Sequence, residues 1–158
     1  MKFISKLVLS SVLLLTLVAG TAQANTTDVV KDNILEAIQN IDIVSLNVLL
    51  AEGADINAVD EKGNTALMLA SKIGNPRMVK IILAHNPDIN KQNNMGYTAL
   101  MIASEQGQTH LVEELLKQSA DSTLKNMDGF TAAELAIRNG QPNAADLLKG
   151  RTQKVIVR

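Results

Sequence analysis

The sequence predicts an all-α solenoid of about four stacked helix-turn-helix units, and three observations point to that fold class. Gly63, Gly96 and Gly129 each open a similar block and stand 33 residues apart, which is the signature of a repeat architecture. Hydrophobic residues make up 46% of the chain but aromatic residues only 2%. Apolar residues recur at helical spacing inside each block. Because β-sheets favour β-branched and aromatic residues, this aliphatic composition favours helices.

Composition excludes several functional classes. The chain has no cysteine, so it holds no disulfide, thiolate metal ligand, cysteine nucleophile or lipid-modified N-terminal cysteine. Charged residues make up 20% of the 158 residues and the formal net charge is -1, which indicates neither a disordered chain nor a nucleic-acid binder. One folded domain is expected at this length.

Residues 1–24 have the layout of a cleavable secretory signal peptide. Lys2 and Lys6 give a positive start, an apolar stretch runs from Leu7 to Gly20, and Ala22-Gln23-Ala24 supplies a small-x-small cleavage site. The apolar stretch is shorter than the roughly 20 residues that a membrane-spanning helix needs, so cleavage is expected, with an uncleaved anchor as the alternative. The short basic start is typical of bacterial export. It predicts a periplasmic mature chain without stable membrane insertion, and secretion is the alternative.

The repeat domain is expected at residues 25–149, in units of about 28–59, 60–92, 93–125 and 126–149. Residues 60–92 and 93–125 align without a gap and share 11 identities. The first unit is more divergent, but residues 33–37 match the first helix of later units and residues 48–57 match the second helix and its exit. Neither helix can bury its apolar side alone, so the units must stack on one another.

Aliphatic side chains are expected to build the core of the stack. The expected core positions are Leu67, Leu69 and Ala70 in the first helix, Val79, Ile82 and Leu83 in the second, and the small residues Ala70, Ala103 and Ala136 at close helix contacts. The end units carry polar residues where interior units are aliphatic: Glu36 at one end and Lys149 at the other. A capping unit needs such a polar face because it has no neighbour on one side.

The turns repeat with the same period. Asp55, Asp88 and Asp121 recur at one turn position, where an Asp side chain accepts a hydrogen bond from its own backbone. A periodic acid of this kind is architectural rather than catalytic. Asn86 and Ser119 replace the usual helix-ending glycine, a position that requires a left-handed backbone, and Asn tolerates that conformation better than Ser.

The last unit is expected to begin with a capping box and to lead into a basic tail. Thr131 and Glu134 form the T-x-x-E pattern of such a box. Residues 150–158 hold three basic residues and no acid, and a frayed terminus is expected there. The Val155-Ile156-Val157 triplet leaves two alternatives, strand addition to a partner or packing on the last unit.

The repeated motifs resemble those of ankyrin repeat proteins. The family pattern is a Gly turn, then T-P-L-H-x-A-A, a second Gly, a V-x-x-L-L helix and G-A-D-x-N. The matching segments here are Thr65-Ala66-Leu67-Met68, Thr98-Ala99-Leu100-Met101, the helices that contain Val79 and Val112, and Gly53-Ala54-Asp55-Ile56-Asn57. The family's Pro is Ala in these units and its His is Met or Glu, so the family's Thr–His hydrogen bond cannot form. The resemblance covers residues 28–149 and implies units joined by β-hairpin-like turns, with a partner protein bound on the concave face.

Two aromatic residues share one repeat position on that implied face. Tyr97 and Phe130 are 33 residues apart, and Asn64 is their equivalent one unit earlier. Aromatic residues, Met and Arg are enriched at binding hot spots, which favours a binding role. The predicted partner-binding residues are Tyr97, Phe130, Met95, Met127, Arg138, Asn64, Lys62 and Asp128. The alternative is that the rings only cover the base of each hairpin against the next unit.

No motif supports enzymatic chemistry or a bound cofactor. His85 and His110 occupy different repeat positions and lack metal-ligand spacing, so solvent-exposed structural histidines are expected. The glycines form neither G-x-G-x-x-G nor G-x-x-x-x-G-K, so phosphate binding is unsupported. The sequence therefore predicts a non-enzymatic, monomeric module that binds a protein and needs no metal or cofactor. The alternative is an inhibitor or immunity-like accessory protein that masks an exported enzyme or toxin.

Overall fold

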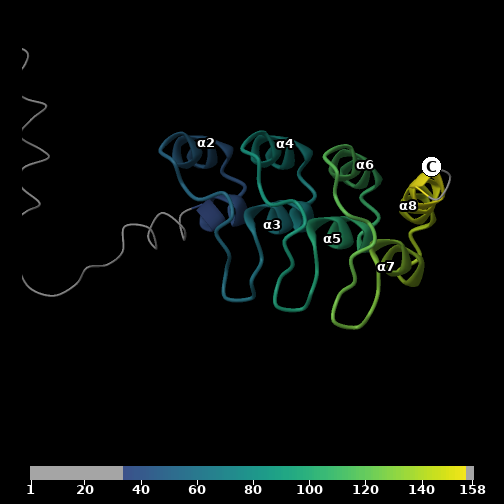
Figure 1. Ribbon diagram of the computed structural model, residues 1–158. Helices are drawn as coiled ribbons and strands as arrows, with labels where there is room; N and C mark the ends of the chain where they lie inside the picture. Colours follow the sequence, from purple (N-terminus) through teal and green to yellow (C-terminus); the bar gives the residue numbers. More distant parts are fainter. Residues whose placement is uncertain (1–33, 156–158) are drawn as a thin grey trace, which may run out of the picture.

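Pairs of helices stack along one axis, with the second helices of the units in one row, the first helices in another, and hairpin loops projecting beyond them (Figure 1). The structure is a computed structural model that describes residues 34–155, with the backbone alone for residues 151–155. The predicted signal peptide, residues 1–24, lies outside the described residues. The predicted all-α repeat solenoid is confirmed.

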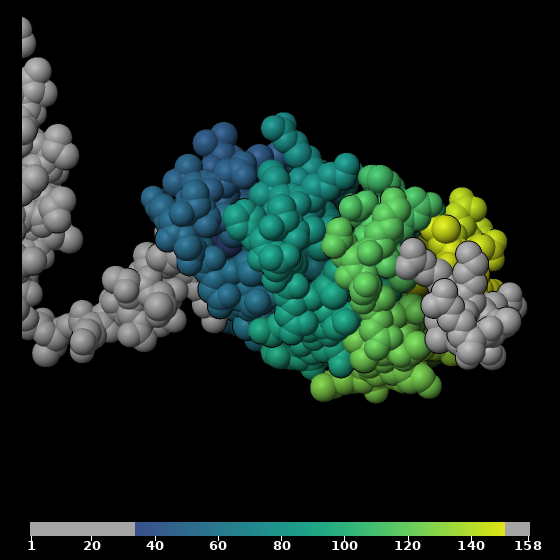
Figure 2. All heavy atoms as spheres, turned by 45° about the horizontal axis from the view of Figure 1, so that its top comes forward, coloured from purple at the N-terminus to yellow at the C-terminus, as the bar shows by residue number. Residues whose placement is uncertain are grey.

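The order of elements follows the repeat. After a helical segment at residues 34–39, the chain forms α2 (Ile43–Ala51), α3 (Ala66–Ile73), α4 (Pro76–Ala84), α5 (Ala99–Glu105), α6 (Thr109–Lys117), α7 (Ala132–Arg138) and α8 (Pro142–Val155). Within the described residues the hairpins contain no strand, only an isolated antiparallel bridge between Val59 and Thr65. Consecutive units form adjacent blocks of surface in chain order (Figure 2).

Threonine begins the first helix of three successive units. The Thr65, Thr98 and Thr131 hydroxyls accept hydrogen bonds from the backbone N–H three residues on, at 3.2, 3.2 and 3.4 Å. Each bond satisfies one of the N–H groups that a helix start leaves without a partner. The predicted capping box of Thr131 and Glu134 is also confirmed, because both of its reciprocal bonds are present.

Helix ends adopt the left-handed backbone that the repeat predicts. Asn86 has a φ of 51° and Ser119 a φ of 66°, at the position where Gly53 has a φ of 89° in the first unit. The turn acids behave as expected, since Asp55, Asp88 and Asp121 each accept from the backbone N–H two residues further on. The sequence therefore predicts this local geometry correctly.

The turns also join one unit to the next. The Asn57 side-chain oxygen accepts from the backbone N–H of Asp88, and the Asn90 oxygen accepts from that of Asp121, both at 2.8 Å. These bonds cross from one unit to its neighbour at the helix exits. They fix the register of the stack in addition to the apolar packing.

The buried core is aliphatic, as composition predicts. Ala70, Ala103 and Ala136 are fully buried, which confirms the small-residue contacts. Met68 and Met101 are buried as well, although neither is among the expected core positions. Other expected core positions fit less well, because Leu69 and Leu83 are only partly buried.

The C-terminal helix runs further than expected. Residue 150 is where the sequence predicts a frayed tail, but the backbone of α8 stays helical to Val155. The segment after Lys149 contains no proline, and its Arg, Gln and Lys residues are good helix formers. A helix that has already begun at Pro142 gains one hydrogen bond for each residue added, so it continues past the end of the repeat pattern.

Candidate partner-binding face

A polar side chain at the start of each hairpin fixes the position of the residue four places further on. In the three hairpins that residue is Asn64, Tyr97 or Phe130, which share one repeat position. The side-chain Oδ1 of Asp60, Asn93 and Asn126 accepts from the backbone N–H four residues on, which belongs to Asn64, Tyr97 and Phe130. The three donor–acceptor distances are 2.7, 2.9 and 2.9 Å. The two rings therefore stand on hairpins of the same shape, as the repeat predicts.

Neighbouring hairpins are hydrogen-bonded at their tips. The backbone N–H of Asn94 donates to the Lys62 carbonyl, and that of Met127 donates to the Met95 carbonyl, both at 3.0 Å. Gly96 permits this contact: a Cβ atom there would lie 2.8 Å from the backbone nitrogen of Met127. The tips consequently form one continuous edge, which we call the hairpin face together with the adjoining first helices α3, α5 and α7.

A ladder of side-chain amides runs beneath this face and stops at Tyr97. Asn64 Nδ2 donates to Asp60 Oδ2 at 2.9 Å, and Asn93 Nδ2 donates to Asn64 Oδ1 at 2.8 Å. Asn126 is the equivalent of Asn93 one unit later, but its buried Nδ2 has no hydrogen-bond partner among the residues that the structure describes. The acceptor would have to come from position 97, where tyrosine replaces asparagine. Tyr97 thus leaves a buried donor unsatisfied.

Between the second and third units the hairpin face is hollowed by a groove of about 560 Å³. Both α3 and α5 contribute to it, as do both hairpins. Its lining residues are Glu61, Lys62, Asn64, Met68, Leu69, Lys72, Asn93, Asn94, Met95, Tyr97, Ile102, Glu105 and Gln106. A second hollow of about 370 Å³ toward the first unit shares Lys62, Asn64 and Leu69, so the depression extends along the stack.

The groove gathers half of the predicted partner-binding residues. Lys62, Asn64, Met95 and Tyr97 line it, and Met95 is 61% exposed. Asn64 takes part through the amide ladder, so its side chain is already engaged within the protein. The groove also includes Leu69 and Ile102, which are not among the predicted partner-binding residues. Their shared repeat position on successive first helices was the signal that could have found them.

The other predicted residues lie outside this groove, on the hairpin and helix of the next unit. Met127 is 79% exposed, the most exposed of the large apolar residues that the structure describes, and Asp128 is exposed beside it. The guanidinium carbon of Arg138 lies 5.0 Å from the centroid of the Phe130 ring. Phe130 is half-buried, and one side of its ring is thus occupied by a cation from its own chain.

Charged groups on the hairpin face are mostly unpaired with one another. Among the described residues the single ion pair within 4.0 Å joins Lys117 and Glu114, away from the groove. Lys62 and Lys72 therefore present their ammonium groups at the groove without an ion-pair partner from the described part of the chain.

The carboxylate of Glu134 lies at the start of α7. The Thr131 backbone N–H and the Thr131 hydroxyl both donate to this carboxylate, and these bonds hold the pKa of Glu134 below its ordinary value.

The described residues hold no group of three or more His, Cys, Asp or Glu that could bind a metal ion. His85 and His110 are both exposed, as the sequence predicts. No helix in the described part of the chain is long and apolar enough to cross a membrane.

These features define a class of protein: an α-helical repeat scaffold with an open, partly apolar groove on one face. A family model described as ankyrin repeats, in three copies, matches residues 34–126 and 86–157. The chain therefore belongs to the ankyrin repeat family. Ankyrin repeats are generally protein–protein interaction modules and are typically non-enzymatic. A search of curated proteins found no match to the chain.

Proposed function

We propose that this protein is an exported binding module that holds a partner protein on its hairpin face, with Tyr97 at the centre of the contact. The observation that carries the proposal is the interrupted amide ladder. Leaving a buried donor such as Asn126 Nδ2 unpaired costs about 1–3 kcal/mol. An asparagine at position 97 would provide the acceptor, as Asn64 does one unit earlier.

A residue that lowers stability is a candidate for function, because binding sites often depart from the most stable local arrangement. Tyr97 lines the groove beside the exposed Met95. Tyrosine is among the residue types that most often dominate binding energy, and methionine adapts its shape to a partner. Leu69 and Ile102 supply the apolar floor of the same groove, on which a partner side chain would lie.

The test measures how well variants of residue 97 capture the partner, and it uses substitutions that change binding and stability to different extents. A hot-spot tyrosine contributes about 2 kcal/mol or more, roughly 30-fold in Kd. Tyr97→Asn and Tyr97→Ala are therefore both expected to lose capture, whereas His110→Ala, exposed at the start of α6, is expected to retain it. Tyr97→Asn completes the amide ladder and should unfold at a higher urea concentration than Tyr97→Ala.

Retained capture by Tyr97→Asn, with a helical circular-dichroism signal like that of the wild type, would remove Tyr97 from the site. A double variant of Tyr97 and Phe130 extends the test to both rings. Identification of the captured partner by mass spectrometry separates a general binding module from the narrower role of an inhibitor, since an inhibitor would lower the activity of a captured enzyme or toxin.

Export to the periplasm rests on the layout of residues 1–24. If the signal peptide is cleaved as proposed, the mature chain begins at Asn25 and is released by osmotic shock of the cells. N-terminal sequencing of the released protein checks the cleavage site. Recovery of the chain only in the cytoplasm, still beginning at Met1, would contradict the proposed location without affecting the proposed binding face.

A further inference from the structure

Methionine is the residue type through which a mild oxidant can act on this chain. The sequence has no cysteine and no tryptophan, so all of its sulfur is thioether. Oxidation converts a methionine thioether into a polar sulfoxide, and reduction restores it. The methionines that the structure describes fall into two groups. Met68, Met78 and Met101 are at most 1% exposed, whereas Met95 is 61% and Met127 is 79% exposed.

The repeat does not require an apolar side chain at either exposed position. Met95 is the equivalent of Lys62 in the preceding unit and of Asp128 in the next, and Met127 is the equivalent of Asn94. It is the backbone of these positions that joins the hairpins, since the N–H of Met127 donates to the carbonyl of Met95 at 3.0 Å. The fold therefore uses the backbone of Met95 and makes no comparable demand on its side chain.

Met95 differs from Met127 in its place on the hairpin face. Met95 lines the groove of about 560 Å³ together with Tyr97, and Met127 is not among the lining residues. One amide oxygen, Oδ1 of Asn93, accepts from the N–H of Met95 at 3.0 Å and from the N–H of Tyr97 at 2.9 Å. Met68 also lines the groove, but it is buried, so an oxidant reaches its sulfur only when the fold opens locally.

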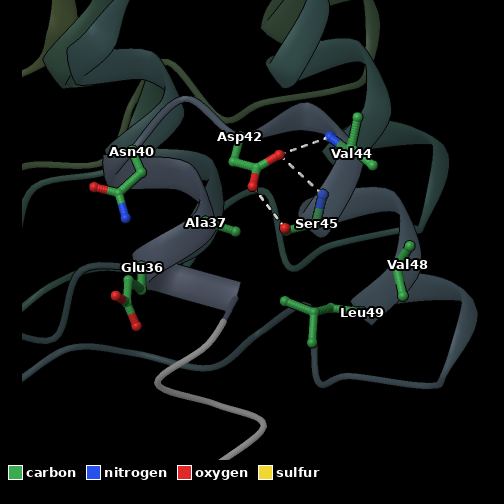
Figure 3. Close-up of a pocket in the computed structure, with 8 residues that line it drawn as sticks. All are labelled: Glu36, Ala37, Asn40, Asp42, Val44, Ser45, Val48 and Leu49. Carbon is green, nitrogen blue, oxygen red and sulfur yellow. Dashed lines mark hydrogen bonds between the residues drawn. The ribbon is translucent and has the colours of Figure 1, made fainter.

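The hollow at the other end of the stack offers no such site. It measures about 390 Å³ and lies between the helical segment 34–39 and α2. Figure 3 shows the Asp42 carboxylate at this hollow, hydrogen-bonded to Val44 and Ser45. The residues that line it include neither a methionine nor an aromatic residue. Among the described residues, the exposed thioethers lie on the hairpin face.

We propose that Met95 is a site of reversible oxidation that switches the groove between an apolar and a polar state, with a hydroperoxide as the oxidant. The sulfur lone pair attacks the terminal oxygen of the hydroperoxide, and the S–O bond forms as the O–O bond breaks. The proton passes to the departing alkoxide, which leaves as an alcohol. The thioether loses the two electrons that the hydroperoxide gains. A dithiol reverses the step, because it is oxidised to a disulfide while the sulfoxide oxygen leaves as water.

The effect on binding rests on the proposed function of the groove. Leu69 and Ile102 give the groove its apolar floor, and the sulfoxide of Met95 adds a strongly polar oxygen to the same groove. A partner that covers this oxygen has to displace its water, so oxidation is expected to weaken binding about tenfold in Kd. The sulfoxide of Met127 forms outside the groove and is expected to have a much smaller effect.

The first test maps the reaction and needs no partner. The full-length protein is treated with tert-butyl hydroperoxide, and peptide mass spectrometry follows the addition of one oxygen to each methionine. Met95 is expected to react at least tenfold faster than Met68 and Met101, because a buried sulfur reacts only when the fold opens. A rate at Met95 equal to the rates of the buried methionines overturns the proposal.

The emission of Tyr97 reports on the groove, because Tyr97 is the only tyrosine and the chain has no tryptophan. A sulfoxide holds water near the ring, so acrylamide is expected to quench this emission more strongly after oxidation. The increase is expected in Met127→Leu, which keeps the thioether of Met95, and not in Met95→Leu, which keeps that of Met127. Equal changes in the two variants, or no change in either, overturn the proposal.

Binding gives the last readout, and the probe is the purified protein that the wild type captures and Tyr97→Ala does not. Each variant is compared with itself before and after treatment, and circular dichroism checks that it stays folded. Oxidation is expected to raise Kd about tenfold in Met127→Leu and much less in Met95→Leu. Equal changes in the two variants overturn the switch, even where Tyr97→Ala loses capture and the proposed function stands. If Tyr97→Ala retains capture, the proposed function fails, and the mapping and quenching results alone decide whether Met95 is the oxidation site.

Discussion

The guanidinium group of Arg138 lies over the ring of Phe130, with its central carbon 5.0 Å from the ring centroid. An exposed cation–π contact of this kind contributes about 0.5–1 kcal/mol to stability. It joins the end of α7 to the hairpin before it, so it holds two of the predicted partner-binding residues against each other. We expect a double-mutant cycle of Arg138→Ala and Phe130→Leu, measured by urea unfolding, to give a coupling energy in this range. A coupling near zero would mean that the contact does not hold the two side chains together.

Gly96 is expected to tolerate substitution much less well than Gly129. Both have a positive φ, of 77° and 83°, so an alanine at either site introduces the same backbone strain. At Gly96 the added Cβ also meets the backbone nitrogen of Met127 at 2.8 Å, whereas nothing lies within 4 Å at Gly129. Gly96→Ala should therefore lower the free energy of unfolding by about 1–3 kcal/mol more than Gly129→Ala. Equal losses in urea unfolding would show that the hairpin tips separate at little cost.

Ser119 offers a route to higher stability. Its φ of 66° places a residue with a Cβ in the left-handed region, at the end of α6. That conformation costs about 1–2 kcal/mol for most residues and little for glycine. We expect Ser119→Gly to raise the free energy of unfolding by about 1 kcal/mol after the entropy of the unfolded chain is counted. Asn86→Gly is the matched control and should gain less, because asparagine tolerates this conformation.

The capping box makes the start of α7 sensitive to acid. The hydrogen bonds from Thr131 lower the pKa of Glu134 in the folded state from its usual 4.5. The ionised carboxylate therefore stabilises the fold above the unfolded pKa, and this contribution is lost as pH falls through the lower folded value. We expect the urea midpoint of the wild type to exceed that of Glu134→Ala at neutral pH. The difference should shrink at about pH 3. An unchanged difference at both pH values would mean that the charge of Glu134 plays no part.

Several local features follow from particular residues. Thr131 and Glu134 are separated by the spacing of a capping box, and a box forms. Asn86 and Ser119 stand where the repeat ends a helix, and both adopt a positive φ. These predictions succeed because each depends on a few neighbours in the chain. The backbone of α8 beyond Lys149 is the exception: the repeat pattern ends there, but helix propagation does not.

The structure brings together only some of the residues that the sequence predicts to bind a partner. Tyr97 and Met95 meet in one groove, but Phe130 and Arg138 form a separate contact with each other. Leu69 was assigned to the core and instead lines the groove, since its helix side faces the hairpins and not the next unit. Which side of a helix is covered depends on the angle and spacing of the stacked units. A 33-residue period in the sequence does not contain that information.

The sequence by itself determined the repeat, the all-α fold, the helix caps and the turn geometry, because these arise from interactions over a few residues and from a repeated pattern of burial. Only the tertiary structure decided where units meet. It set the approach of Gly96 to Met127, the groove beside Tyr97 and, within the described residues, the unpaired amide of Asn126. Each of these features involves residues about one repeat apart, so each depends on the register in which the units stack.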